Sequence, residues 1–298
     1  MTNDTNNRDA GAAPLSFAPV RGDDAALAQY VALFAACFPG TGKFTLDYLR
    51  WLYADNPDGV VVGYDAWDGA RLAAHYVCVP GMATVGGETV RVLLSLNTAT
   101  HPDYQGKGLF TRLAALTYDS GREQGYDAVY GVANSNSTPG FIRKLGFQLV
   151  RPLEARVGVG GVGTPPHGQG AAVSFERTRS PAALAWRCAN PDNPVRMRRR
   201  GAAWQFEAAA LGLARAYGEL ALPDGAGWRA TDVPLGWTPA RLYLGLVPDG
   251  ERAFLCYPPI PERVRPSPLN LIYRSLSGRV ERLDPAAIRF SFLDFDAY

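Results

Sequence analysis

The sequence predicts a mixed α/β fold, with a central, mainly antiparallel mixed sheet flanked by helices and a second α/β domain after it. Two observations support this prediction. Apolar residues first recur at helical spacing, and the pattern then changes to runs rich in Val, Leu and Tyr that are separated by glycine turns. The chain has 298 residues, of which 47% are apolar and 19% charged, so it can form the cores of two domains of ordinary size.

Residues 23–38 and 45–54 are predicted to form the first two helices. The first helix would be followed by Pro39-Gly40, and the second by Asn56-Pro57. Five apolar side chains share one face of the first helix, at intervals of three and four residues: Leu27, Tyr30, Val31, Phe34 and Phe38.

Three strands are predicted next, at residues 59–66, 71–79 and 89–100. Short glycine turns, Asp68-Gly69 and Gly86-Gly87, separate them. Turns of this length join neighbouring antiparallel strands, so the three runs read as a meander.

A helix at 109–124 follows the meander, and then a strand at 127–133. A short helix ending at Leu145 and a strand from Phe147 complete the pattern. The alternation of strands and helices after the meander is typical of a sheet covered by helices.

The composition divides the chain into four parts. Residues 1–14 are polar and are predicted to be a disordered tail; they lack the basic and apolar segments of a signal peptide. A first domain is expected at 15–152, a glycine-rich linker at 153–180 and a C-terminal domain at 181–298. A cytoplasmic protein is expected.

Charge and cysteine usage exclude several function classes. The net charge of +2 argues against a dedicated binder of nucleic acid or of a membrane surface. No apolar run approaches the roughly 18 residues of a membrane span. The 4 cysteines match no zinc pattern and only 3 histidines are present, so no metal site is expected.

Gln105-Gly106-Lys107-Gly108 stands between a predicted strand and a predicted helix. The glycines let main-chain N–H groups approach an anion closely, and the helix start adds the positive end of a dipole. Lys107 adds a full positive charge. The sequence therefore predicts a pyrophosphate cradle built largely from main chain.

With these residues, the chain resembles the GNAT superfamily of acyl-CoA N-acyltransferases. The family signature Q/R-x-x-G-x-G/A is matched from Gln105 to Phe110, with Phe110 at the final small position. A second signature, a short helix ending in K-x-G-F, reads Lys144-Leu145-Gly146-Phe147. The predicted order of elements also agrees, over about residues 15–152.

One short pattern occurs twice in the chain. Leu49-Arg50-Trp51 is followed by Asn56-Pro57, and Leu184-Ala185-Trp186 is followed by Asn190-Pro191. Chance, a shared way of ending a helix, or a true duplication would each explain it. Because no second cradle signature is present, the C-terminal half resembles at most a degenerate GNAT-like half of a tandem form.

The resemblance implies that acetyl-CoA is the co-substrate. Main-chain groups at the end of the strand would bond the pantetheine arm, and the cradle amides would hold the pyrophosphate. One of the two asparagines after the strand at 127–133, Asn134 or Asn136, would contact the pantetheine. The alternative is that both are ordinary turn residues. The residues expected to contact CoA are Thr98, Ala99, Thr100, Gln105, Gly106, Lys107, Gly108, Leu109, Phe110, Asn134 and Asn136.

The catalytic groups are harder to assign, because the sequence has Ile142 where the family places its usual tyrosine acid. An amine must be neutral to attack, so a base or a water chain must remove a proton. His75 lies in mid-strand beside the expected acceptor cleft; the alternative is a core or surface histidine. Residues 290–298 read as a final strand. The resemblance to tandem GNAT proteins implies that Asp294, Asp296 or the Tyr298 carboxylate would lie in the active site; the alternative is an edge strand with solvated acids.

The function expected from the resemblance is N-acetyl transfer from acetyl-CoA to a primary amine of a small molecule, an amino sugar being one candidate. A main-chain N–H of the central strand would bind the oxyanion. The alternative is a non-catalytic acyl-CoA sensor or regulator, which the missing tyrosine keeps open. Neither nucleic acid nor a membrane is expected as a partner, and a homodimer is one option.

Overall fold

The structure is a computed structural model that describes residues 14–210, 214–251, 254–261, 263, 265 and 268–296. Most of the tail predicted at 1–14 lies outside this part of the chain, and so does Tyr298.

The chain begins with a strand and two helices, namely β1 (Ser16–Pro19), α1 (Asp24–Cys37) and α2 (Leu46–Tyr53). Both helices start at side-chain caps. The Asp23 carboxylate accepts a hydrogen bond from the amide of Ala26 at 3.1 Å, and the Thr45 hydroxyl accepts one from the amide of Tyr48 at 3.2 Å. The two predicted helices are therefore confirmed.

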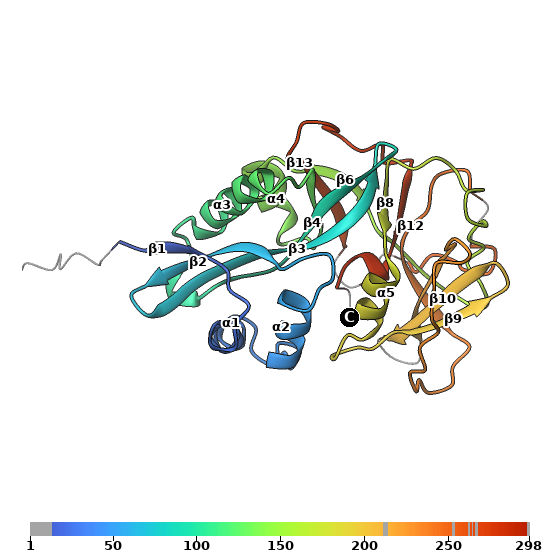
Figure 1. The fold of residues 1–298 in the computed structure, drawn as a ribbon, viewed down its shortest axis with the longest axis horizontal. Coiled ribbons are helices and arrows are strands. Elements are labelled where there is room, and N and C mark those ends of the chain that lie inside the picture. Colours follow the sequence, from blue (N-terminus) through green and yellow to red (C-terminus); the bar gives the residue numbers. More distant parts are fainter. Residues whose placement is uncertain are drawn as a thin grey trace, which may run out of the picture.

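The predicted meander is also present, as β2 (Val62–Asp68), β3 (Arg71–Val85) and β4 (Glu88–Thr100). After it come α3 (Leu109–Glu123) and β5 (Ala128–Ala133), which lies parallel to β4. The first half ends with α4 (Thr138–Leu145) and β6 (Gln148–Pro152). Figure 1 shows α1 and α2 on one face of this sheet and α3 and α4 on the other.

The C-terminal part adds one helix, α5 (Pro181–Cys188), and further strands. The strands are β7 (Glu154–Gly158), β8 (Phe175–Thr178), β9 (Arg196–Arg200), β10 (Ala203–Ala209), β11 (Arg215–Leu220), β12 (Arg241–Leu246), β13 (Asn270–Ser275) and β14 (Ile288–Ser291). The linker predicted at 153–180 is irregular only in its middle, residues 159–174. Its two ends form β7 and β8, because β7 pairs with β12 and β8 pairs with β3 and β14.

The described strands join into one 14-stranded sheet, whose main order is β6-β13-β5-β4-β3-β8-β14-β12-β11-β10-β9. Most neighbours are antiparallel; the described parallel pairs are β4–β5, β8–β14 and β11–β12. β13 comes from the C-terminal half but lies between β5 and β6, antiparallel to both. The sheet of the first half is therefore completed by a strand from the second.

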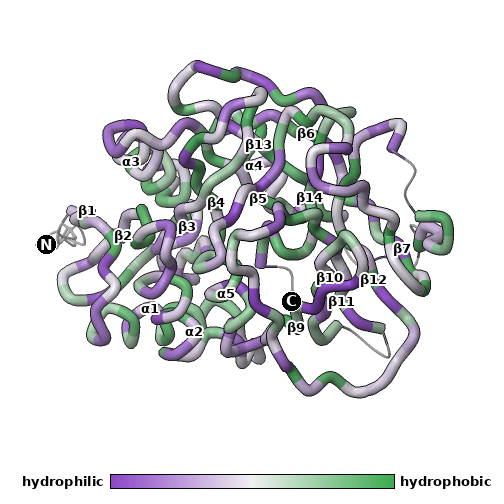
Figure 2. The backbone as a smooth tube through the Cα atoms, turned by 45° about the vertical axis from the view of Figure 1, so that its right-hand side comes forward, coloured by the Kyte–Doolittle hydropathy of each residue, from purple (hydrophilic) through white to green (hydrophobic). Residues whose placement is uncertain are grey.

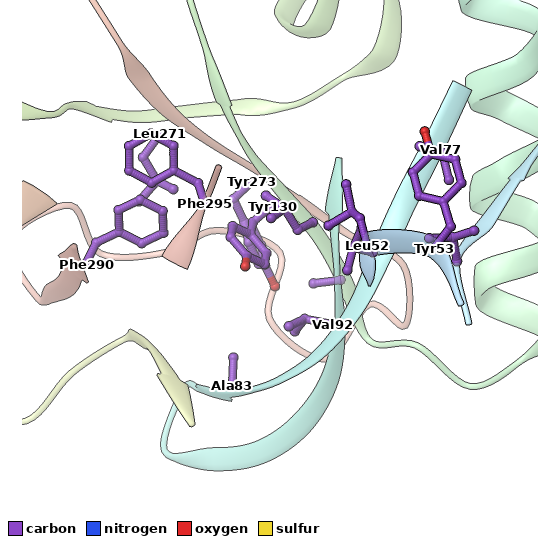
Figure 3. Packing of buried hydrophobic residues seen from close by; sticks show 14 of the residues in the cluster. Leu52, Tyr53, Val77, Ala83, Val92, Tyr130, Leu271, Tyr273, Phe290 and Phe295 are labelled. Carbon is purple, nitrogen blue, oxygen red and sulfur yellow. The ribbon is translucent and has the colours of Figure 1, made fainter. Parts of the chain in front are cut away.

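The hydrophobic core crosses between the halves. One cluster packs α1 and α2 against the sheet, and a second packs α3 and α4 against the opposite face. Hydrophobic stretches follow the central strands, whereas several outer loops are hydrophilic (Figure 2). Figure 3 shows members of the first cluster that come from both halves: Leu52, Tyr53, Val77, Ala83, Val92, Tyr130, Leu271, Tyr273, Phe290 and Phe295.

The sequence pattern that occurs twice forms a contact between the halves. Trp51 on α2 and Trp186 on α5 stack with ring centroids 4.7 Å apart. Each indole N–H donates to the backbone oxygen of the other residue, both at 2.8 Å. The asparagine after each helix is buried and accepts from an amide two residues ahead: Asn56 from Asp58 and Asn190 from Asp192. The two segments are thus alike in structure as well as in sequence.

We expect Trp186→Ala to lower the free energy of unfolding by about 3 kcal/mol, because it removes a large stacked side chain and leaves the Trp51 carbonyl without its donor. Denaturant unfolding measures this. Trp237→Ala is the control, since Trp237 is 90% exposed and its loss is expected to change stability by less than about 0.5 kcal/mol. Equal effects of the two substitutions would contradict the prediction.

Candidate active site

The strands β4 and β5 separate near their ends. Their pairing runs from Val92 to Ser95 on β4, opposite Ala128 to Gly131 on β5. Beyond Ser95 the described pairing of β4 is with β3 alone, up to Thr100. The β5-facing edge of residues 96–100 is therefore open to another extended chain, as expected for the segment with Thr98, Ala99 and Thr100.

A β-bulge lies at this point of separation. His75 pairs with Ala99 and Val77 pairs with Leu96, so two residues of β4, Asn97 and Thr98, lie opposite one residue of β3. Asn97 has φ of 48°, in the left-handed region. Asn is among the few residues other than glycine that adopt this region readily. The sequence analysis missed this bulge.

The loop after β4 is the segment for which a pyrophosphate cradle was predicted. A 3₁₀ turn at Pro102–Tyr104 leads to Gly106 and Gly108, which have φ of 77° and 72°. A β-carbon at either glycine would meet nothing within 4 Å, so the space above the loop is open. Gly108 caps α3 and offers no side chain, and the first amides of a helix lack partners within it. These features fit an anion such as the pyrophosphate of CoA.

Individual cradle residues differ in what they offer. The Gln105 amide donates to the Pro102 carbonyl at 3.3 Å, so it closes the turn, and the donors for an anion begin at Gly106. The Lys107 ammonium lies 4.8 Å from the centre of the Tyr104 ring. Leu109 is buried and Phe110 partly buried in the core beneath α3, so these two would bind through main chain only.

The two predicted asparagines lie in the turn between β5 and α4. The Asn134 side-chain oxygen accepts from the amides of Asn136 and Ser137, both at 3.0 Å. This carboxamide therefore closes the turn, which agrees with the alternative of an ordinary turn residue. Asn136 is exposed beside it, and its contact with the pantetheine stays a prediction.

His75 is fully buried against α1 and α2. Its Nδ1 lies 2.7 Å from Oδ1 of Asp65, and its Nε2 lies 2.9 Å from the hydroxyl of Tyr53. In this arrangement the imidazole cannot contact the amine substrate that would accept the acetyl group. This agrees with the alternative interpretation of His75 as a core histidine. A role in proton transfer would have to act through Tyr53, whose own pKa is raised well above its usual value by burial.

The chain end differs from the predicted final strand. β14 ends at Ser291, and residues 292–294 form a 3₁₀ turn. The turn forms because the Asp294 carboxylate accepts from the Ser291 amide at 2.6 Å, while the Ser291 hydroxyl caps the same turn. Asp294 is buried and also pairs with Arg179, so it has a structural role.

Asp296 contacts α2 and the loop before it, and its role in catalysis stays a prediction. Its Oδ2 accepts from the Tyr48 hydroxyl and lies 2.5 Å from the Lys43 ammonium. Burial and then the charge of Asp296 raise the pKa of Tyr48 well above its usual value. The Tyr298 carboxylate, which was predicted as an alternative to Asp296, lies outside the described residues.

Asp296 lines a small cavity of about 40 Å³ that also touches Leu94 and Leu96 of β4. Its Oδ1 is buried and makes no hydrogen bond to the residues that the structure describes, and the same holds for Nη1 of Arg187 on the cavity wall. Such a cavity has room for a water molecule or for a polar group of a ligand. Two side chains of opposite charge, each with one unpaired polar atom, therefore line this cavity beside Leu94 and Leu96.

Ile142 lies on α4 and packs against the core beneath α3 and α4, so no hydroxyl stands at the family's acid position. Sequence analysis missed Tyr48, Tyr53 and Asp65 as polar groups near the site. The two tyrosines lie on α2 and Asp65 on β2, and only folding brings these elements to the end of β4.

Within the described ranges, no group of three or more His, Cys, Asp or Glu side chains is placed to hold a metal ion. Across the same residues, each helix is too short or too polar to cross a bilayer.

Comparison with known proteins agrees with this geometry. Residues 21–150 match a family model described as an acetyltransferase (GNAT) domain. Among curated protein sequences, none matches this chain.

Solved structures extend the similarity to most of the chain. A probable N-acyltransferase from Enterococcus faecalis is similar with a TM-score of 0.58 at 10% identity, covering 89% of this chain and 73% of that one. A GCN5-related N-acetyltransferase from Kribbella flavida gives 0.58 at 13%, with 89% and 72% covered. One from Anabaena variabilis gives 0.57 at 12%, with 88% and 73% covered. Identities this low show the shared fold. The predicted cradle and the separated strands both lie within residues 21–150, the part of the chain that matches the acetyltransferase (GNAT) model.

Proposed function

We propose that the protein is an acetyl-CoA-dependent N-acetyltransferase that acts on a primary amine of a small molecule. One observation carries the proposal: an open strand edge at residues 96–100 leads directly into an open, glycine-based cradle at the start of α3. Together they offer main-chain partners for an extended arm that ends in a pyrophosphate, which is the chemical layout of CoA.

The chain's own groups would bind the co-substrate in order along this path. The amides from Gly106 into the first turn of α3 would hold the pyrophosphate, assisted by Lys107. Thr98 to Thr100 would pair with the amides of the pantetheine arm as a neighbouring strand does. The thioester supplies the activated acetyl group, and a main-chain N–H near the Asn97 bulge would bind its carbonyl oxygen.

We assign to Asp296 the role of binding the acceptor amine and removing its proton. A carboxylate attracts an ammonium ion and can accept the proton that the amine must lose before it attacks. Tyr48 and Lys43 hold Oδ2 in place, whereas Oδ1 makes no hydrogen bond to the described residues, and the side chain lines the cavity beside β4. The acceptor is proposed as a primary amine, with amino sugars among the compounds to be tested.

A second function, a non-catalytic acyl-CoA sensor, is favoured by one observation. Ile142 stands where a tyrosine acid is usual in the family, so the leaving thiolate lacks that proton donor. A sensor would need the cradle and the open strand edge but no acid or base.

Two measurements separate these functions. Calorimetry measures CoA binding, and thiol release from acetyl-CoA is followed across a panel of amino sugars, polyamines and amino acids. We expect CoA to bind and at least one amine to accelerate thiol release. Binding without amine-dependent release would support the sensor, and a chain that does not bind CoA would contradict both functions. A homodimer and a cytoplasmic location stay predictions of the sequence.

A further inference from the structure

A chain of buried hydrogen bonds connects the interior of the first half to the bulge on β4. Oδ1 of Asp65 lies 2.7 Å from Nδ1 of His75, and Nε2 of His75 lies 2.9 Å from the Tyr53 hydroxyl. The side-chain amide of Asn97 donates to the same hydroxyl at 3.3 Å. Asp65, His75 and Tyr53 are each at most 1% exposed, whereas Asn97 is half-buried.

The Asp65 carboxylate sets the direction of this hydrogen-bond series, because it can only accept. Nδ1 of His75 therefore donates to Asp65. In the neutral ring Nε2 then accepts from the Tyr53 hydroxyl, and the Tyr53 oxygen accepts from Asn97. The second carboxylate oxygen of Asp65 accepts from the Tyr30 hydroxyl at 2.8 Å. Each link polarises the next, which strengthens the hold of Tyr53 on Asn97.

Stability alone does not explain this arrangement. Buried carboxylate and imidazole groups lose their hydration, and apolar side chains of similar size often serve a core as well or better. Asp65 and His75 are directly paired residues of β2 and β3, in a layer that is otherwise aromatic and aliphatic. The series of hydrogen bonds, however, ends at the side chain of Asn97. This residue lies where β4 separates from β5, and it has a positive φ.

We propose that Asp65, His75 and Tyr53 are positioning residues, which hold Asn97 and so fix the main chain of the bulge that the reaction uses. This inference rests on the proposed transferase function. Under this proposal His75 acts by orienting the Tyr53 hydroxyl, and it does not itself remove a proton from the amine. Orientation matters here because an N–H that binds a thioester oxygen acts only when it is correctly aimed.

The test compares two buried tyrosine hydroxyls. Tyr53→Phe removes the acceptor of Asn97, whereas Tyr118→Phe removes a hydroxyl that bonds Tyr76 on the other face of the sheet. Both variants are expected to lower the melting temperature. Only Tyr53→Phe is expected to reduce kcat, by about tenfold to a hundredfold. Its Kd for CoA is expected to rise by a smaller factor, because the cradle is untouched and only the strand edge that meets the pantetheine is loosened.

A double-mutant cycle makes the test specific to the contact. Asn97→Gly removes the held side chain while permitting the positive φ. If the hydroxyl acts through Asn97, the double variant is expected to have the same kcat as either single variant. Multiplied losses of kcat, or a Tyr53→Phe enzyme with full kcat, would overturn the proposal.

A second readout does not depend on turnover. Amide hydrogen exchange of residues 96–100 in the protein without CoA is expected to become faster in Tyr53→Phe and to stay unchanged in Tyr118→Phe. Equal exchange in the two variants would also overturn the inference. A wild-type protein that binds CoA but acetylates no amine would contradict the proposed function, while the exchange experiment would still decide whether Tyr53 holds the bulge.

Discussion

Gly108→Asp is expected to weaken CoA binding at least about 100-fold. The new carboxylate would stand at the start of α3, where the amides are proposed to meet the pyrophosphate. Two like charges about 4 Å apart near a protein surface repel by about 4 kcal/mol, which exceeds the roughly 2.7 kcal/mol of a 100-fold change. A side chain at φ of 72° adds about 1 kcal/mol of strain. Calorimetric titration with CoA measures the effect.

The control for this prediction is Gly201→Asp, in the turn between β9 and β10. Gly201 also has a positive φ, 62°, and a β-carbon there would meet nothing within 4 Å. Gly201→Asp therefore introduces the same negative charge and a similar backbone strain at a position away from the cradle. We expect both variants to fold and only Gly108→Asp to lose CoA. Unchanged affinity in a folded Gly108→Asp protein would contradict the assignment of the cradle.

Asp296→Asn is expected to lower kcat/KM for the amine by about 100-fold, within the usual range for loss of a general base, while the Kd for CoA stays nearly unchanged. The amide keeps the shape of the side chain but removes its negative charge. It can no longer attract an ammonium ion or take its proton. Steady-state kinetics at saturating acetyl-CoA, together with calorimetry, separate these effects.

Asp294→Asn, two residues away, is the matched control. Asp294 is buried, pairs with Arg179 and accepts from the Ser291 amide, so losing its charge leaves a buried arginine unpaired. We expect a loss of about 3 kcal/mol in stability and full kcat in the folded protein. Asp296→Asn with full activity would remove Asp296 from the mechanism. A chain ending at Asp296 tests Tyr298 separately, because turnover that survives this truncation excludes the Tyr298 carboxylate.

Local patterns determined much of the fold. The two N-terminal helices, the meander and the cradle follow from residues close together in the sequence: apolar spacing, capping side chains, and glycines where the main chain needs a positive φ. Gly106 and Gly108 show this most clearly, since their turn conformation and their exposed amides are properties of a few neighbouring residues. The family resemblance implied that main-chain groups at the end of β4 would be free for the pantetheine arm, and the strand pairing shows β4 separated from β5 there.

The tertiary structure decided what depends on contacts between distant segments. The sequence did not show that β13 lies between β5 and β6, or that Trp51 and Trp186 stack across the halves, because such pairing depends on partners more than 100 residues away, such as Tyr130 for Tyr273. Asp294 and Asp296 look alike in sequence, and only folding places Asp294 against Arg179 and Asp296 against Tyr48. His75 likewise reads as a candidate base, yet the structure buries it between Asp65 and Tyr53, because α1 and α2 cover that face of the sheet. The sequence by itself determined the glycine loop at residues 105–108 and the elements around it, since these rest on local geometry. Which acidic and aromatic side chains reach the transfer site was decided by long-range packing.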